Sequence, residues 1–285
     1  MTDVNINVRL VSIPYSTRDS LDPCISKIVD EFNMGPYNIL MQNDIDCDMF
    51  NQKCRSVVVD FPESKIIYFI YRGTNQVIQL LMQALPVTKN FLGLGQTKQY
   101  YVSASDTFWK NQKHIVMDPK YKDYKFIYTG HSLGGSLAFL SAMRAVIQGK
   151  IPGDQIELMT FGEPRSGHRS FTKQVKNYIK NDIRITQNSD NVPNFPKCTR
   201  SSIRNSVCNP NNDNSFYHHG LEYWFFNYSS PHDQYKICDG LPENEDPTCI
   251  DHRRNPTLLS IQSWIDHISY LGLNMFKYAH DMCKP

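Results

Sequence analysis

The sequence lacks an apolar run long enough to cross a membrane. Its best run, Leu137 to Met143, ends at Arg144, far short of the ~18 apolar residues that a transmembrane helix needs. Charge of one sign is also scarce, because 30 Lys and Arg oppose 28 Asp and Glu, for a formal net charge of +2. Without a basic patch there is no electrostatic case for nucleic acid. We therefore expect neither a transmembrane segment nor a nucleic-acid partner.

Cysteine is missing from the middle of the chain but collects in polar stretches towards its two ends. An even number in such places predicts four disulfides and an oxidising compartment, although eight reduced thiols in a cytosolic protein remain an alternative. The eight residues are Cys24, Cys47, Cys54, Cys198, Cys208, Cys238, Cys249 and Cys283.

Secretion agrees with these cysteines, although the first residues lack the basic start and apolar core of a signal peptide. A mature secreted chain whose signal peptide is absent from this sequence reconciles the two observations. One sequon, Asn227-Tyr228-Ser229, predicts glycosylation at Asn227.

The H-E-x-x-H zinc motif is absent as well. His218, His219 and His232 are the alternative candidates for a metal site, but neighbouring residues on a strand face opposite ways. We expect no metal and no organic cofactor.

What the sequence does have is a strand, a tight turn and a helix around one serine. Residues 124–129 alternate like a strand, Gly130-His131-Ser132-Leu133-Gly134 follows, and residues 135–148 are small and apolar like a buried helix. A G-x-S-x-G turn in this context presents a nucleophilic serine at the edge of a sheet, with glycines where strand and helix would otherwise collide. Ser132 is therefore the predicted nucleophile.

Elsewhere, strand and helix patterns alternate. Apart from a short helix over 25–32, the first 50 residues look irregular. Strands are predicted over 55–60, 65–71, 157–162, 183–186 and 217–226, and helices over 76–85, 104–112 and 171–178. Alternation of this kind predicts one α/β domain over residues 1–285, with a mixed, mostly parallel central sheet flanked by helices.

A serine nucleophile needs a base, and the base needs an acid to hold it. In α/β hydrolases these follow the serine in the order acid, then histidine. Asp190 directly follows a predicted strand and His267 lies near the end of the chain, so both fit that order. Asp266 is a weaker alternative acid, because its side chain and that of its neighbour His267 point in different directions.

Five motifs, in a fixed order, resemble those of one known family. They are Tyr71-Arg72-Gly73-Thr74, Gly130-His131-Ser132-Leu133-Gly134-Gly135, Phe161-Gly162-Glu163-Pro164-Arg165, Asp190-Asn191-Val192-Pro193 and Asp266-His267-Ile268-Ser269-Tyr270. Through them the chain, from about residue 45 to its C-terminus, resembles the class 3, or fungal-type, lipases. The Cys-rich ends are most similar to a secreted nematode branch.

The resemblance implies an α/β-hydrolase fold with Ser132 as nucleophile, Asp190 as acid and His267 as base. It implies that Thr74 and Leu133 supply the oxyanion donors, and that residues 75–97 contain a lid; a plain core helix over 76–85 is the alternative.

For the cysteines, the resemblance implies disulfides Cys24–Cys283, Cys47–Cys54 and Cys238–Cys249, with Cys198–Cys208 as an extra bridge and with the ends of the chain stapled. Arg72, Glu163 and Arg165 are interpreted as structural charge pairs.

The function that follows is hydrolysis of a carboxylic ester through an acyl-enzyme. A secreted triacylglycerol or acylglycerol lipase, acting on lipid at a lipid–water interface, is the leading hypothesis. The alternatives are a phospholipase A1, a polar esterase of the feruloyl type and a non-catalytic lipid-binding protein.

Overall fold

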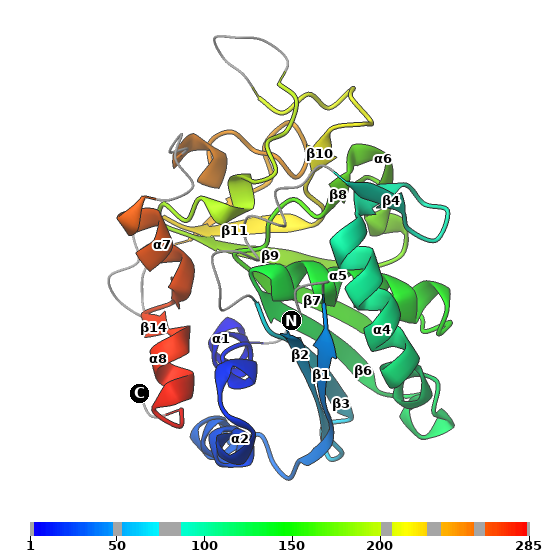
Figure 1. Cartoon of the computed structure of the whole chain (residues 1–285), viewed down its shortest axis with the longest axis vertical. Helices are drawn as coiled ribbons and strands as arrows, with labels where there is room; N and C mark the ends of the chain where they lie inside the picture. Colours follow the sequence, from blue (N-terminus) through cyan, green and yellow to red (C-terminus); the bar gives the residue numbers. More distant parts are fainter. Residues whose placement is uncertain are drawn as a thin grey trace.

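A computed structural model describes residues 3–47, 53–73, 87–200, 207–226, 235–253 and 260–283. Within these ranges an eight-stranded sheet crosses the middle of the molecule, in the order β1-β2-β3-β6-β7-β9-β11-β12 (Figure 1). Its strands are β1 (Asn38–Asp46), β2 (Lys53–Phe61), β3 (Ile66–Tyr71), β6 (Lys125–His131), β7 (Ile156–Phe161), β9 (Asn181–Gln187), β11 (Leu221–Phe225) and β12 (Lys236–Cys238).

The five inner strands, β3, β6, β7, β9 and β11, run parallel to one another, whereas the outer pairs are antiparallel. Every residue of β7 is buried, as expected for a parallel strand covered on both faces. The mixed, mostly parallel sheet predicted from the alternating pattern is therefore present, and its parallel strands end together at one edge, where β6 delivers Ser132.

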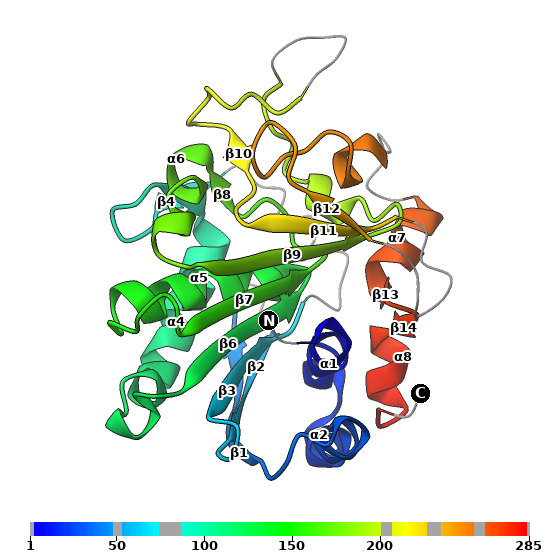
Figure 2. The same ribbon diagram turned by 180° about the vertical axis from the view of Figure 1, so that it is seen from behind.

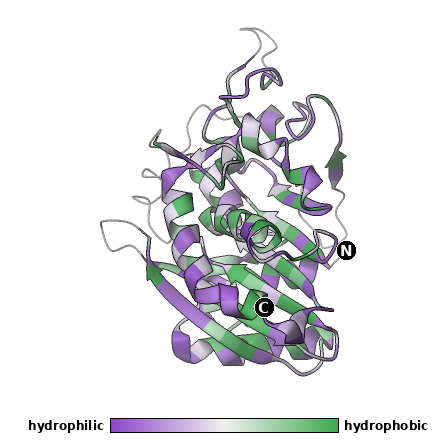
Figure 3. Ribbon diagram, turned by 90° about the vertical axis from the view of Figure 1, so that its right-hand side faces the viewer, coloured by the Kyte–Doolittle hydropathy of each residue, from purple (hydrophilic) through white to green (hydrophobic). Residues whose placement is uncertain are grey.

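Helices cover both faces of the sheet (Figures 1 and 2). On one face lie α4 (Gln99–Val116) and α5 (Leu133–Ile147), which pack with the aromatic side chains of β3 and β6. On the other lie α1 (Val4–Leu10), α2 (Arg18–Phe32) and α8 (Met275–His280). In Figure 3 hydrophobic residues gather along the strands inside the fold, and the outer loops are largely hydrophilic.

Three predictions about local structure were wrong. The first 50 residues are not irregular, since they contain α1, β1 and a helix α2 that begins at Arg18 rather than at the predicted Ile25. The strand predicted over 217–226 is broken into β10 (Phe216–Tyr217) and β11, because Gly220 takes a positive φ of 65° between them. Likewise, the helix predicted over 171–178 is split into α6 (Arg169–Thr172) and the 3-10 turn η3 (Val175–Asn177).

Residues 75–86 of the proposed lid region lie outside the described residues, which resume at Val87. The part that is described, residues 87–97, contains β4 (Thr88–Asn90) and β5 (Gln96–Lys98). These strands belong to a small four-stranded sheet in the order β10-β8-β5-β4, with β8 formed by Gly167–His168.

The remaining described elements are short. They are the 3-10 turns η1 (Ile13–Tyr15), η2 (Pro119–Tyr121), η4 (Val192–Asn194) and η5 (Ile250–Arg253), the hairpin β13 (Ser269–Tyr270) with β14 (Leu273–Asn274), and α7 (Ile261–Ile268). In the described part of the chain, no helix is both long enough and apolar enough to span a bilayer.

All eight cysteines are paired in the structure, in the connectivity that the resemblance implied. One bridge links α2 to the segment after α8, with Cα atoms 5.0 Å apart. The others close short loops in the cysteine-rich stretches. The pairs are Cys24–Cys283, Cys47–Cys54, Cys198–Cys208 and Cys238–Cys249.

Candidate active site

Ser132 occupies a sharp turn between β6 and α5. Its backbone takes φ 58° and ψ −127°, a conformation that a non-glycine residue seldom adopts. Space for the turn depends on two glycines, because a Cβ at Gly130 would lie 2.2 Å from the Gly134 carbonyl oxygen and one at Gly134 would lie 2.1 Å from that of Tyr71. The tight strand-to-helix turn predicted from the motif is therefore formed.

A chain of hydrogen bonds joins Ser132, His267 and Asp190. The Ser132 Oγ lies 2.9 Å from Nε2 of His267, and Nδ1 of the same ring lies 2.9 Å from Oδ2 of Asp190. The three residues come from the end of β6, the end of α7 and the loop after β9. They are 1%, 2% and 0% exposed respectively, so water is largely excluded from the chain.

Further contacts fix the Asp190 carboxylate. Tyr270 donates its hydroxyl to Oδ2 at 2.5 Å, and the Val192 backbone N–H donates to Oδ1 at 2.9 Å. Burial, and then the nearby carboxylate of Asp190, raises the pKa of Tyr270 well above its ordinary value, so this hydroxyl remains a donor. With these donors and His267, both oxygens of Asp190 accept hydrogen bonds, so the orientation of the carboxylate is fixed.

The alternative acid Asp266 does not contact His267 through any hydrogen bond found in the structure. One of its carboxylate oxygens accepts from the Ser189 backbone N–H at 3.1 Å, and the other from the Gln262 amide at 2.9 Å. Asp266 therefore holds the loop that carries Asp190. It does so from a buried position on α7, where it is only 5% exposed.

A second hydrogen-bonded chain, not expected from the sequence, joins the N-terminal segment to the site. The Gly73 backbone N–H lies 3.1 Å from the Tyr15 hydroxyl, which lies 2.8 Å from Nδ1 of His131. Nε2 of His131 lies 2.7 Å from the His267 carbonyl oxygen. Because a carbonyl only accepts, Nε2 carries the proton, and the Tyr15 hydroxyl donates to Nδ1 while accepting from Gly73.

His131 is neutral in this arrangement. Burial, and then repulsion from His267, holds its pKa well below the ordinary value of 6.5. The two rings lie close, with centroids 4.6 Å apart. His131 is thus a fixed spacer that couples the end of β3 to the backbone of His267, and it adds no charge beside the imidazole that faces Ser132.

Of the two predicted oxyanion donors, the structure describes Leu133 but not Thr74. Leu133 is the first residue of α5, so its backbone N–H has no acceptor within the helix and the helix dipole favours negative charge there. Thr74 lies outside the described residues, as does the sequon residue Asn227. Gly73, directly before Thr74, lies against the site, since a Cβ on it would come 3.0 Å from Cβ of Ser132.

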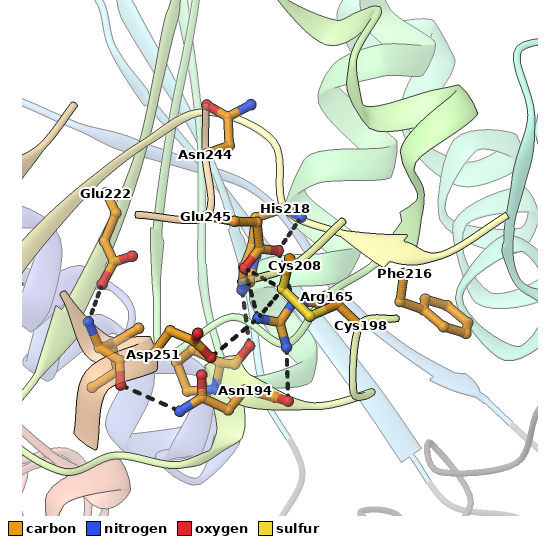
Figure 4. A network of polar contacts seen from close by, with 12 residues as sticks. Arg165, Asn194, Cys198, Cys208, Phe216, His218, Glu222, Asn244, Glu245 and Asp251 are labelled. Carbon is orange, nitrogen blue, oxygen red and sulfur yellow. Dashed lines mark hydrogen bonds and ion pairs between the residues drawn. A yellow bond between two sulfur atoms is a disulfide. The ribbon is translucent and has the colours of Figure 1, made fainter. Parts of the chain in front are cut away.

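Of the three residues interpreted as structural charge pairs, Arg165 and Glu163 form ion pairs. Arg165 donates two hydrogen bonds to the Glu245 carboxylate, at 2.7 and 2.6 Å, and a third to the Asn194 carbonyl (Figure 4). Figure 4 shows Arg165 enclosed by these residues and by Asp251. Its guanidinium therefore ties the loop after β7 to the disulfide-linked segments above the sheet.

The other two charged residues differ in their partners. Glu163 lies 3.2 Å from Nε2 of the buried His219, so it does form a charge pair. Arg72 instead donates to the Lys53 carbonyl oxygen at 2.5 Å, so the charge pair interpreted for it is not formed among the described residues.

The histidines considered for a metal do not form a metal site in the described residues. His218 donates from Nε2 to the Pro193 carbonyl at 2.8 Å, and His219 is held between Glu163 and Asp182. His232 lies outside the described residues. Across the described ranges, no group of three or more His, Cys, Asp or Glu side chains is arranged to hold a metal ion.

Comparisons with known proteins agree with this architecture. The family model described as "Lipase (class 3)" matches residues 68–200. The Caenorhabditis elegans lipase ZK262.3 is 28% identical, and the alignment covers 100% of this chain and 82% of that protein. The Rhizomucor miehei lipase is 26% identical over 74% of this chain and 53% of that protein.

Among solved structures, the fold is similar to that of a triacylglycerol lipase described as having a serine protease triad. The TM-score is 0.75 at 20% identity, and the match covers 98% of this chain and 95% of that one. The fold is thus that of an α/β hydrolase, and the protein is a serine hydrolase of carboxylic esters. The chain is similar to the class 3 lipases, whose family model matches residues 68–200, and to a nematode lipase along its whole length.

Proposed function

We propose that this lipase hydrolyses acylglycerols, with Ser132 as nucleophile, His267 as general base and Asp190 as the acid that orients His267. The observation that supports the assignment is the continuous hydrogen-bonded chain from Ser132 Oγ through both ring nitrogens of His267 to Asp190. A hydroxyl becomes a competent nucleophile when a neighbouring base removes its proton, and this geometry supplies that base.

The proposed reaction forms and then hydrolyses an acyl-enzyme, with His267 carrying the proton in each step. Ser132 Oγ attacks the ester carbonyl carbon while its proton passes to His267 Nε2. The negative charge on the carbonyl oxygen is stabilised by the Leu133 N–H and by Thr74. His267 then returns the proton to the departing alcohol, which leaves an acyl-enzyme. Water, deprotonated by the same nitrogen, releases the carboxylic acid and restores Ser132.

Triacylglycerol or another acylglycerol is the proposed substrate, as a structural relative of similar fold is described as a triacylglycerol lipase. Ser132 is only 1% exposed, so its hydroxyl lies below the surface and a lipid ester must enter the protein to reach it. Opening at a lipid surface would account for that requirement. A phospholipase A1 is the second candidate, because it needs the same triad and the same access.

We also propose that the protein is secreted, with Asn227 as a glycosylation site. Four disulfides in one chain support an oxidising environment. Free thiol titration of the denatured, unreduced protein from its native source should find close to none; eight titratable thiols would contradict secretion.

The decisive measurement is turnover of a p-nitrophenyl ester by the unmodified protein and by Ser132→Ala. We expect the variant to lose ~10⁴-fold or more in kcat, and the pair Ser132→Ala with His267→Ala to be barely worse than either alone. Tributyrin, phosphatidylcholine and a feruloyl ester assayed side by side then give the substrate class. A folded His267→Ala protein with near-normal activity would refute the assignment of the base.

A further inference from the structure

Helix α7 buries polar residues and exposes apolar ones, which is the reverse of the usual surface helix. Such helices place an apolar stripe against the core and polar residues outside. In α7 the buried residues are Ser263, Asp266 and His267. The residues left exposed or partly exposed at its surface are Ile261, Gln262, Trp264, Ile265 and Ile268.

The apolar members of that surface form one continuous stripe. Ile261, Trp264, Ile265 and Ile268 follow the i, i+3, i+4, i+7 spacing of a single helix face. Ile261 is 80% exposed and Ile265 is 47% exposed. Two exposed isoleucines one turn apart, with an indole beside them, make a patch that a soluble surface does not normally leave uncovered.

This patch is continuous with the active site. His267 lies on the same two turns of helix and faces inward to Ser132, and the Trp264 ring lies 5.9 Å from the His267 ring, measured between centroids. Figures 1 and 2 show α7 beside the ends of β9 and β11, at the edge of the sheet where the parallel strands finish. The patch therefore lies on the side of the molecule at which an ester must arrive.

We infer that the exposed face of α7 is a surface that adsorbs to neutral lipid; this inference rests on the proposed function, because a lipid surface is where the substrate would be. No charged side chain of α7 is exposed, since Asp266 is 5% and His267 2% exposed. Interfacial helices that select anionic lipid carry Lys and Arg on their polar face, and α7 has none. The patch therefore suits an uncharged or zwitterionic surface.

Adsorption through α7 is separate from opening of the site. The patch is exposed while Ser132 is 1% exposed, so the closed protein already presents it. Binding to lipid can then come first, and access to Ser132 second. The prediction is that a closed or catalytically inactive protein still binds lipid through this helix.

The test uses the Ser132→Ala chain, which removes turnover, and vesicles of phosphatidylcholine with brominated acyl chains, which quench tryptophan emission on contact. We expect the Ser132→Ala protein to float with the vesicles and its Trp264 emission to be quenched. In the double variant, Ser132→Ala with Trp264→Phe, this quenching should be missing. The other two tryptophans are Trp224, which is 6% exposed, and Trp109 on α4, which is partly exposed; the chain without Trp264 measures the contribution of both. Binding without quenching of Trp264 would overturn the inference, because another face would then contact the lipid.

A double variant, Ile261→Ser with Ile265→Ser, tests whether these two side chains contribute to the affinity for lipid. We expect at least tenfold weaker partitioning, about 1.4 kcal/mol. The matched control is Met117→Ser, since Met117 is 55% exposed and follows α4 at the edge of the sheet where β6 begins, away from Ser132. It should leave partitioning unchanged. Equal partitioning of the isoleucine pair and the unmodified chain would refute the inference.

Two further measurements keep the result unambiguous. Ile261→Trp adds a larger interfacial side chain and should strengthen flotation, the opposite direction to the isoleucine pair. Size-exclusion chromatography tests for a second copy of the chain on the patch: a dimer that the isoleucine pair converts to monomer, with vesicle binding unchanged, would overturn adsorption. If instead vesicles bind as expected but the unmodified chain turns over no ester, the proposed function fails and the lipid surface stands.

Discussion

The buried ion cluster around His219 should make the stability of this protein depend on pH. Nδ1 of His219 lies 2.9 and 2.8 Å from the two carboxylate oxygens of Asp182, and Nε2 lies 3.2 Å from Oε1 of Glu163. Both nitrogens thus face carboxylates, which requires a proton on each. The ring also stacks on Phe139 at 3.8 Å between centroids, and its side chain is 1% exposed.

These contacts determine whether the stability of the fold rises or falls with pH. Burial by itself lowers the pKa of His219, but attraction to Asp182 and then Glu163 outweighs it and raises the pKa from 6.5 to about 9. A histidine with a raised pKa stabilises the fold fully below its unfolded value, near 6.5, and the stabilisation is lost as pH rises through about 9. At about 1.4 kcal/mol per pH unit, the rise corresponds to ~3 kcal/mol.

The measurement is urea unfolding at constant ionic strength, with the disulfides intact, at pH 6 and at pH 9.5. We expect the unmodified chain to lose ~3 kcal/mol of unfolding free energy between the two pH values. His219→Gln should start ~3–5 kcal/mol lower at pH 6, because two buried carboxylates lose their counter-charge, and should then change little. Taking the difference between the two proteins removes the contributions of groups that titrate in both.

His280→Gln is the control, since the His280 side chain is 90% exposed and lies 3.4 Å from Asp281. An exposed pair of this kind contributes little to stability, so its pH dependence should match that of the unmodified chain. Parallel curves for His219→Gln and the unmodified chain would refute the reasoning, because the proton on His219 would then not be linked to folding.

Three further outcomes follow from the site and the disulfides. Tyr270→Phe removes a charged hydrogen bond to Asp190 and should lower kcat by ~10-fold or more with little change in KM, as steady-state kinetics on a soluble ester will show; an unchanged kcat would mean that the hydroxyl is dispensable. Tyr15→Phe leaves the Gly73 N–H and Nδ1 of His131 without this partner. It should lower the free energy of unfolding in urea by ~1–3 kcal/mol; an unchanged free energy of unfolding would contradict the role of Tyr15. Replacing Cys24 and Cys283 together by Ser should cost ~2–5 kcal/mol, measured the same way, and a loss under ~1 kcal/mol would contradict a structural role for that bridge.

The part of the site that sequence reasoning found is the part encoded locally. The turn around Ser132 is specified by five consecutive residues and by the strand and helix that flank them. Asp190 and His267 were predicted because the order of acid and base along the chain is fixed, Asp190 follows a predicted strand, and His267 lies near the end of the chain. Signals of this kind survive in a single sequence, because the physical constraint and the residues that satisfy it lie close together.

The supporting contacts were missed because they join segments far apart in the chain. Tyr15 meets His131 across 116 positions, and nothing in the residues around Tyr15 indicates such a partner. Tyr270 stood within a recognised motif, but its hydrogen bond to Asp190 depends on how hairpin β13–β14 folds back after α7. The buried position of Tyr270 could not be obtained from periodicity, since its strand has two residues.

The N-terminal elements were missed for different physical reasons. Helix α2 contains Pro23 in its interior, which ordinarily marks a helix end. Strand β1 is an edge strand with a bulge between Ile39 and Met41, so its burial does not alternate cleanly and its polar residues resemble a loop. In both cases tertiary packing overrides a local signal that favours irregular structure.

The bridge between Cys24 and Cys283 makes most of the chain a closed ring. The two residues are 259 positions apart, so any single peptide-bond cut between them opens the ring but leaves one covalent molecule. Two fragments separate only after a second cut or after reduction. A single proteolytic cut in a loop between the two cysteines would then shift the protein on a reducing gel while leaving its mass on a non-reducing gel nearly unchanged.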